Sequence, residues 1–289
     1  ASSREHVLPR RLAGGHLHGV LFGVRYIYLR YLKSERIGSL LFAIGLLGFG
    51  YILVVIYPSF GKLQAMKEYF EAMPAFLKAF VAEEITDFTT LTGFLTVEFF
   101  NTTWLFVTGI FSCLYAGSLV AEETEKKTLE LLFSTPITRT GYIISKFAGF
   151  LTLLLFLATA SFLGLYLGMW QIGEKIDEGR MFYALFSGTI CIATIGSIAL
   201  LFSCVFNGQR RAISLAMILF FLLWMFNLVA TMLEQYPLLK YFTLFHYCDA
   251  SKIFRRQAIW WPDIGILIAV FAIMLTSSVF IFRRKEIYI

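Results

Sequence analysis

Residues 37–61 read IGSLLFAIGLLGFGYILVVIYPSFG, and this run contains no Asp, Glu, Lys or Arg. A helix of about 20 apolar residues crosses the hydrocarbon core of a bilayer, and a charge at its centre costs about 2.5–3.5 kcal/mol. Five further uncharged stretches follow, at 99–121, 147–173, 181–209, 212–233 and 264–282. The sequence therefore predicts an all-α, polytopic integral membrane protein with six transmembrane helices.

The composition of the chain agrees with this assignment. Of its 289 residues, 58% are hydrophobic and 15% are charged, whereas a soluble domain has about 45–50% apolar and about 25% charged residues. The apolar excess must face lipid, which argues against a cytosolic enzyme, a disordered chain and a secreted disulfide scaffold. Cys113, Cys191 and Cys204 lie inside apolar runs and Cys248 in a loop, so neither a disulfide nor a metal framework is predicted.

The basic residues set the predicted orientation of the spans. With the amino terminus inside, the cytoplasmic segments hold 16 of the 25 Lys and Arg residues, namely Arg4, Arg10, Arg11, Arg25, Arg30, Lys33, Arg36, Lys126, Lys127, Arg139, Lys146, Arg210, Arg211, Arg283, Arg284 and Lys285. The positive-inside rule then places both termini in the cytoplasm. The net charge of +6 is thereby explained by membrane topology, and nucleic acid is not a predicted partner.

The segment before the first span has a helical division of faces. Apolar residues occupy one arc of residues 18–36, and the other arc holds Arg25, Arg30, Lys33 and Arg36. This pattern is typical of a helix that lies in the membrane interface with its cations on lipid headgroups; a solvated linker is the alternative. We expect a tail and interfacial helix at 1–36, a six-span domain at 37–282 and a basic tail at 283–289.

Two longer connections lie on the predicted outer side. Residues 62–98 mix apolar and acidic side chains and are expected to form short amphipathic helices that cap the membrane face, with a substrate gate as the alternative. Residues 234–263 are rich in aromatic side chains, which favour the membrane interface, so a re-entrant or interfacial helix is expected there. Arg255 and Arg256 lie on this side against the general charge rule. They are candidates for contact with an anionic headgroup or substrate, with plain snorkelling as the alternative.

The most informative stretch connects spans two and three and reads AEETEKKTLELLFSTPITR at 121–139. Its charges are spaced for Glu122–Lys126 and Glu123–Lys127 pairs on a helix, and Leu129, followed by Leu132 and Phe133, forms an apolar patch. Pro136 ends this helix, and Arg139 and Lys146 mark the point where the third span enters the membrane as further interfacial anchors. An inner-face helix that is charged at its start and apolar at its end suits a groove of a soluble partner.

The same stretch resembles the hallmark of type-2 ATP-binding-cassette permeases. The usual form has Gly before the Thr-Leu-Glu block, where this chain has Lys127. The resemblance implies that the segment is the coupling helix, which docks on a separate ATPase subunit. The matching positions are Glu122, Glu123, Thr128, Leu129, Glu130, Leu131, Leu132 and Pro136.

The rest of the sequence is consistent with a division of labour between subunits. No Gly-x-x-x-x-Gly-Lys-Ser/Thr phosphate loop is present, and the centres of the spans hold no carboxylate, lysine, arginine or histidine. The resemblance thus implies that this chain is a permease subunit and that the transporter is an exporter. It also implies that the chain has no cofactor of its own, and that ATP and magnesium are bound by the ATPase. Its expected partners are that ATPase, a second permease copy or related chain, the lipid bilayer and additional membrane or periplasmic subunits.

Two other classes of function remain as alternatives at this point. A membrane-embedded enzyme would need clustered reactive side chains, for which His246, Cys248 and Asp249 are the candidates. An ion-coupled carrier would need charges within the spans, where the sequence has none. The expected location is a plasma membrane or bacterial inner membrane, and the sequence does not identify the substrate.

Overall fold

The computed structural model describes residues 9–61, 90–129, 138–233, 237–256 and 261–285, and these are all helical apart from turns. The long elements are α1 (Pro9–Gly61), α5 (Leu105–Ser118), α8 (Arg139–Ile172), α9 (Glu178–Val205), α10 (Gln209–Met232) and α12 (Trp261–Arg284). The short ones are α4 (Leu91–Leu95), the π-helix η1 (Thr96–Trp104), α6 (Ala121–Glu125), the 3₁₀ helices η2 (Pro237–Phe242) and η3 (Leu244–Cys248), and α11 (Ala250–Arg256).

Six helical stretches in the described residues are long and apolar enough to cross a membrane. They are Gly23–Ser59, Leu91–Glu125, Arg139–Ile172, Glu178–Val205, Gln209–Thr231 and Trp261–Arg284. Each contains or largely overlaps one of the six uncharged stretches, so the predicted number and order of candidate spans are confirmed.

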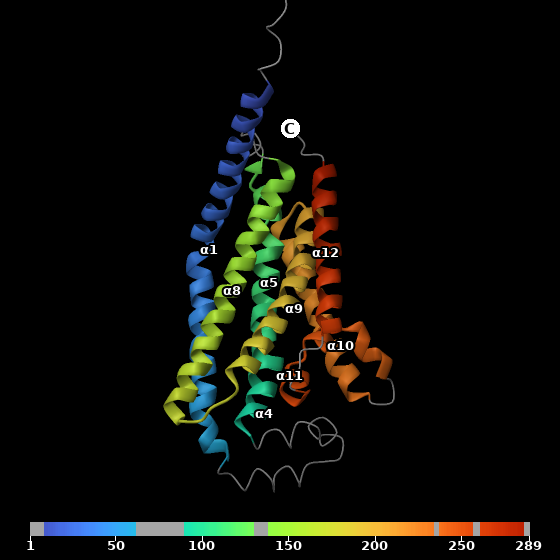
Figure 1. Ribbon diagram of the computed structural model, residues 1–289. Helices are drawn as coiled ribbons and strands as arrows, with labels where there is room; N and C mark the ends of the chain where they lie inside the picture. The colour runs from blue at the N-terminus through green and yellow to red at the C-terminus, as the bar shows by residue number, and fades with distance from the viewer. Residues whose placement is uncertain (1–8, 62–89, 130–137, 234–236, 257–260, 286–289) are drawn as a thin grey trace, which may run out of the picture.

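The first helix differs from the prediction. Helix α1 runs without interruption for 53 residues, a length of about 80 Å, and includes both the predicted interfacial helix and the first span. Because a hydrocarbon core is only about 30 Å thick, a large part of this helix must extend beyond it. In Figure 1, the amino-terminal end of α1 reaches past the start of α8 on the side where the chain ends.

The centre of the bundle is formed by α5 and α9, which are the most buried of the candidate spans. Helix α8 packs between α1 and this centre, while α10 and α12 cover the opposite side (Figure 1). The largest fully buried side chains include Phe99 and Trp104 of η1, Phe111 of α5 and Phe150 of α8. Much of α1, α10 and α12 stays exposed in the single chain, as expected for helices that face lipid or another subunit.

The second span contains an unexpected irregularity. Between α4 and α5, the nine-residue π-helix η1 replaces regular α-helix; such stretches occur frequently at functional or specialised sites. Asn101 of η1 donates through Nδ2 to Asp249 Oδ1 at 2.7 Å, and its Oδ1 accepts from the amide of Ala250 at 2.9 Å. The irregular turn is therefore joined to the outer segment that contains η3 and α11.

The outer connections are only partly described. Residues 62–89 lie outside the described residues, and 91–98 belong to the second span itself. The aromatic connection forms η2, η3 and α11 in place of a single interfacial helix. The backbone of Arg255 and Arg256 ends α11, and their side chains lie outside the part of the chain that the structure describes.

Candidate functional site at the end of the second span

The segment that follows α5 begins with two amides held by another span. The backbone N–H groups of Val120 and Ala121 both donate to Oγ of Ser203, each at 2.9 Å. The first amides of a helix have no partner within the helix, and Ser203, near the end of α9, supplies one for the start of α6. A serine inside an apolar run gives no sequence signal for this role, so sequence reasoning missed it.

Glu123 connects α6 to α8. One carboxylate oxygen, Oε1, lies 2.7 Å from Nζ of Lys146, and the other accepts the hydroxyl hydrogen of Tyr142. Nζ of Lys146 also donates to the carbonyl of Leu119 at 2.8 Å. Lys146 is only 9% exposed, so this is an internal ion pair with additional hydrogen bonds on both partners.

This geometry corrects two details of the sequence interpretation. Glu123 is paired with Lys146 and not with Lys127, because the backbone at Lys127 is left-handed and leaves the helical path there. The buried Lys146 also faces the chain, so its ammonium does not reach lipid headgroups. The Glu122–Lys126 pair is confirmed, with 2.6 Å between the charged atoms. That hydrogen bond raises the pKa of Lys126 above its usual value.

Lys127 has a left-handed backbone, with φ of 54°. It is the only residue with a positive φ, other than glycine, in the described part of the chain. The left-handed region favours glycine because a side chain there crowds the backbone. The position where the resembled motif usually has glycine is thus one at which the local conformation favours glycine.

The end of the segment has further internal contacts. Glu125 Oε2 accepts from the amide of Gln209 at 2.7 Å, which places a carboxylate at the positive end of α10. Thr128 is exposed, whereas Leu129 is 3% exposed and packs in the chain's own core. The remaining residues expected in the coupling helix, Glu130, Leu131, Leu132 and Pro136, lie outside the described residues.

The start of α8 is tied to the end of the chain. Arg139 Nη1 donates to the carbonyl of Lys285 at 2.7 Å, just past the end of α12, where backbone carbonyls lack helical partners. Lys285 in turn donates through Nζ to the carbonyl of Cys204 at 3.0 Å, and burial lowers the pKa of Lys285. The start of α8 and the ends of α9 and α12 are therefore joined by cationic side chains that donate hydrogen bonds to backbone carbonyls.

The predicted anchors on α1 are placed differently from those on α8. The four basic side chains on α1 are exposed and can contact lipid headgroups; they are Arg25, Arg30, Lys33 and Arg36. Arg139 and Lys146 instead make the contacts described above within the chain.

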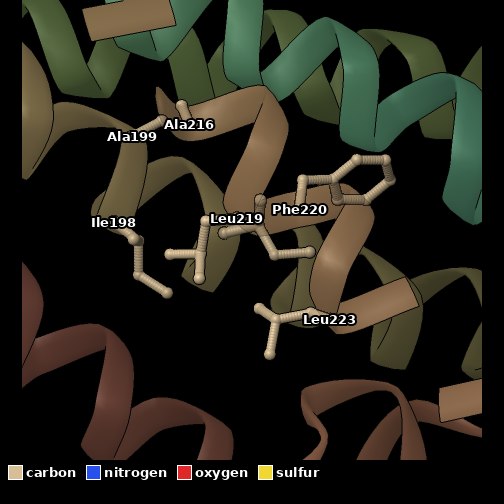
Figure 2. A pocket seen from close by; sticks show the side chains of 7 residues that line it. Ile198, Ala199, Ala216, Leu219, Phe220 and Leu223 are labelled. Carbon is tan, nitrogen blue, oxygen red and sulfur yellow. The ribbon is translucent and has the colours of Figure 1, made fainter. Parts of the chain in front are cut away.

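A small apolar cavity lies between two of the long helices. Figure 2 shows a small cavity between α9 and α10, lined by Ile195, Ile198, Ala199, Ala216, Leu219, Phe220 and Leu223. Its free volume is about 10 Å³, close to the minimum for one water molecule, and its lining has no polar side chain. This cavity is too small to hold a solute larger than a water molecule.

His246, Cys248 and Asp249 each contact other residues of their own segment or of η1. Asp249 accepts from Asn101, and Cys248 is buried with its thiol on the carbonyl of Phe245. Lys252 lies near His246, bonds its carbonyl, and forms an ion pair with Asp263 at 3.0 Å. Burial and then the charge of Lys252 lower the pKa of His246. These contacts stabilise the outer segment, and the described residues contain no group of three or more His, Cys, Asp or Glu arranged to hold a metal ion.

The sequence was compared with known proteins and with protein-family models to find the family of the chain. A search of individually curated proteins gave no match. The model of a family described as ABC-2 family transporter protein matches residues 32–287. This range covers five of the six spans entirely, most of the first, and the whole of the connection between spans two and three. The chain therefore belongs to the ABC-2 family of transporter membrane proteins.

Proposed function

We propose that this protein is the permease subunit of an ATP-driven exporter. A separate ATP-binding-cassette subunit, which binds ATP and magnesium, docks on the connection between spans two and three. Two permease copies, or one copy and a related chain, enclose the pathway. Both termini lie in the cytoplasm, on the side of the ATPase.

The observation that carries this proposal is the internal attachment of the connection. Ser203 of α9 holds its first amides, Glu123 binds Lys146 of α8, and Glu125 binds the start of α10. A force applied to this segment by a partner would therefore act on three spans at once. An exposed, freely hinged loop would transmit little of such a movement.

The pathway is proposed to form between subunits, because the cavity between α9 and α10 cannot contain a substrate. Helices α1, α10 and α12 present apolar surface outward, which suits contact with lipid or with a second permease. Closure of two ATPase subunits would draw the two connections together and convert an inward-open into an outward-open state. Such a change requires that ATP-bound ATPase interacts more favourably with one of the two states.

The test uses the full-length tagged chain, purified from its native membrane with the ATPase that accompanies it. Glu130→Arg and Leu132→Arg place a charge in the predicted docking segment, and Lys175→Glu changes an exposed residue of the connection between α8 and α9. We expect the first two variants to retain at most a tenth of the ATPase retained by the parent. Lys175→Glu should retain the parental amount.

The result that contradicts the proposal is equally specific. If both docking-segment variants are inserted normally in the membrane and still bind and stimulate the ATPase as the parent does, the connection is not the coupling site. Circular dichroism and gel filtration of each purified variant show whether a loss of binding reflects misfolding instead.

A further inference from the structure

A groove runs between α1 and α8 on the outer surface of the bundle. It encloses about 560 Å³ and is lined by Leu32, Arg36, Ile37, Ser39, Leu40, Thr152, Leu153 and Phe156. Its volume falls within the range typical of small-molecule sites. Helices α1 and α8 lie on the side of the bundle away from α10 (Figure 1), and the groove shares no lining residue with the small cavity between α9 and α10.

The packing of α1 against α8 explains why a groove exists at this level. Toward the cytoplasmic side, a Cβ on Gly149 would lie 2.6 Å from the ring of Tyr31, and further along, a Cβ on Gly164 would lie 2.2 Å from the carbonyl oxygen of Leu47. Glycine thus permits close contact of the two helices at both levels. Between them the α8 surface carries larger side chains, including Leu153 and Phe156, and the helices leave the groove.

The lining of the groove selects for one kind of ligand. The Ser39 and Thr152 hydroxyls each donate to a carbonyl of their own helix, at 2.9 Å. Apart from these, the walls are apolar except for Arg36. Among the described residues no carboxylate forms an ion pair with Arg36. A complementary ligand has an apolar chain and a single anionic group.

The depth of the groove in the membrane matches such a ligand. Arg36 is the last charged residue before the uncharged run at 37–61, so we expect its guanidinium at the boundary between headgroups and hydrocarbon. Ile37 and Leu40 continue from this boundary toward the membrane centre. An arginine fork binds phosphate oxygens in a bidentate manner, and the apolar walls beyond it contact hydrocarbon.

We propose that this groove binds an anionic phospholipid of the cytoplasmic leaflet. The phosphate lies on Arg36, and one acyl chain follows Ile37, Leu40 and Phe156 between the two helices. This site does not require an ATPase or a substrate, so it can be true whether or not the proposed transport function is.

The first experiment counts lipids bound to the full-length chain in detergent by native mass spectrometry. The probe is dioleoylphosphatidylglycerol, and glycerol 1-phosphate tests whether the headgroup alone competes. Arg36→Gln should weaken binding of the lipid about tenfold or more, because one charged hydrogen-bonded contact is lost. Arg30→Gln removes the same charge from an exposed residue that does not line the groove, and should leave binding nearly unchanged.

A second pair of variants tests the acyl chain separately. Leu40→Trp fills the groove while leaving Arg36 in place, and Leu41→Trp adds the same ring at a neighbouring residue that is 66% exposed and does not line the groove. We expect lipid binding to fall about tenfold for Leu40→Trp and to persist for Leu41→Trp. Both substitutions are at lipid-facing positions, so we expect both variant proteins to fold. Gel filtration of each purified variant verifies this.

Three results would overturn the proposal. Equal loss of binding for Arg30→Gln and Arg36→Gln would mean general attraction of anionic lipid to a basic helix. Full competition by glycerol 1-phosphate would mean that an anion alone occupies Arg36. Spontaneous disulfide crosslinking of two chains carrying Ile37→Cys would mean that a second copy covers the groove.

Discussion

At the scale of single residues, the ion pair of Glu123 and Lys146 is the contact whose loss should matter most. Its two side chains are 22% and 11% exposed, and the free energy of removing one member of a buried pair is dominated by the charge that is left behind. The carbonyl of Leu119 would also lose its donor. The pair therefore sets the position of α6 relative to α8.

We predict that Lys146→Met lowers the free energy of unfolding by about 3–5 kcal/mol, measured by denaturant unfolding in mixed micelles. Adding Glu123→Gln to Lys146→Met should restore part of this loss, since the uncompensated charge is then removed. Lys126→Met, which breaks the exposed pair with Glu122, serves as the control and should have no measurable effect. Equal effects of the two single lysine substitutions would contradict the assignment.

A second residue-scale prediction concerns Lys127. A left-handed backbone costs a residue other than glycine about 1 kcal/mol or more. Glycine removes this strain from the folded state, although it loses more conformational entropy on folding than other residues do. Lys127→Gly should therefore raise the unfolding midpoint slightly, and Lys127→Val should lower it, because a branched Cβ is strained further. Thermal unfolding in detergent, together with hydrogen exchange over residues 120–129, checks the order. Identical midpoints for the two variants would show that the backbone there adapts without strain.

At the scale of the elements, glycines determine how closely α1 and α8 approach. Gly164 and Gly168 form a Gly-x-x-x-Gly spacing on α8, and a Cβ on Gly164 would meet the backbone of Leu47 at distances too short for any real contact. Such spacing allows two helix backbones to touch in a membrane, where packing replaces the hydrophobic effect as the source of association. The α1–α8 pair is the most extensive helix contact in the described chain.

We predict that Gly164→Ala destabilises the protein by about 1–3 kcal/mol, the usual cost of overpacking, because the α1 backbone cannot rotate away as a side chain can. Gly48→Ala makes the same change on α1 where no atom lies within 4 Å of the added Cβ, and it should be neutral or slightly stabilising. Thermal unfolding of both variants in the same detergent gives the comparison. A Gly164→Ala protein as stable as the Gly48→Ala protein would mean that the two helices are not in contact as described.

At the scale of the whole molecule, the orientation of the spans determines which face an ATPase can reach. All four native cysteines are buried, so single introduced cysteines can report accessibility. Lys127 and Lys175 are both exposed and lie in connections on opposite sides of the bundle. We predict that a membrane-impermeant maleimide labels Lys175→Cys in intact cells and labels Lys127→Cys only after the membrane is opened. The reverse pattern would invert the topology and exclude a cytosolic partner at the connection between spans two and three.

The extent to which the sequence anticipated the structure differs between the bundle and the site. The candidate spans were predictable because lipid exposure imposes a continuous apolar run on each of them. The sequence could not show whether residues 18–36 form a separate interfacial helix or the start of the first span. The helical periodicity of these residues is the same whether the helix lies on the membrane or continues into it. The π-helix η1 and the three short outer helices had no periodic signal of their own.

The sequence by itself determined the helical class, the six apolar stretches and the local Glu122–Lys126 pair, since each depends on neighbours within one run of chain. Only the tertiary structure decided that Glu123 binds Lys146, 23 positions away, and that Ser203 holds the amide of Val120 across 83 positions. Such partners are selected by which helices pack together and at what level. That choice depends on side-chain fit across the whole bundle, including the glycine contacts of α8, and no local pattern encodes it.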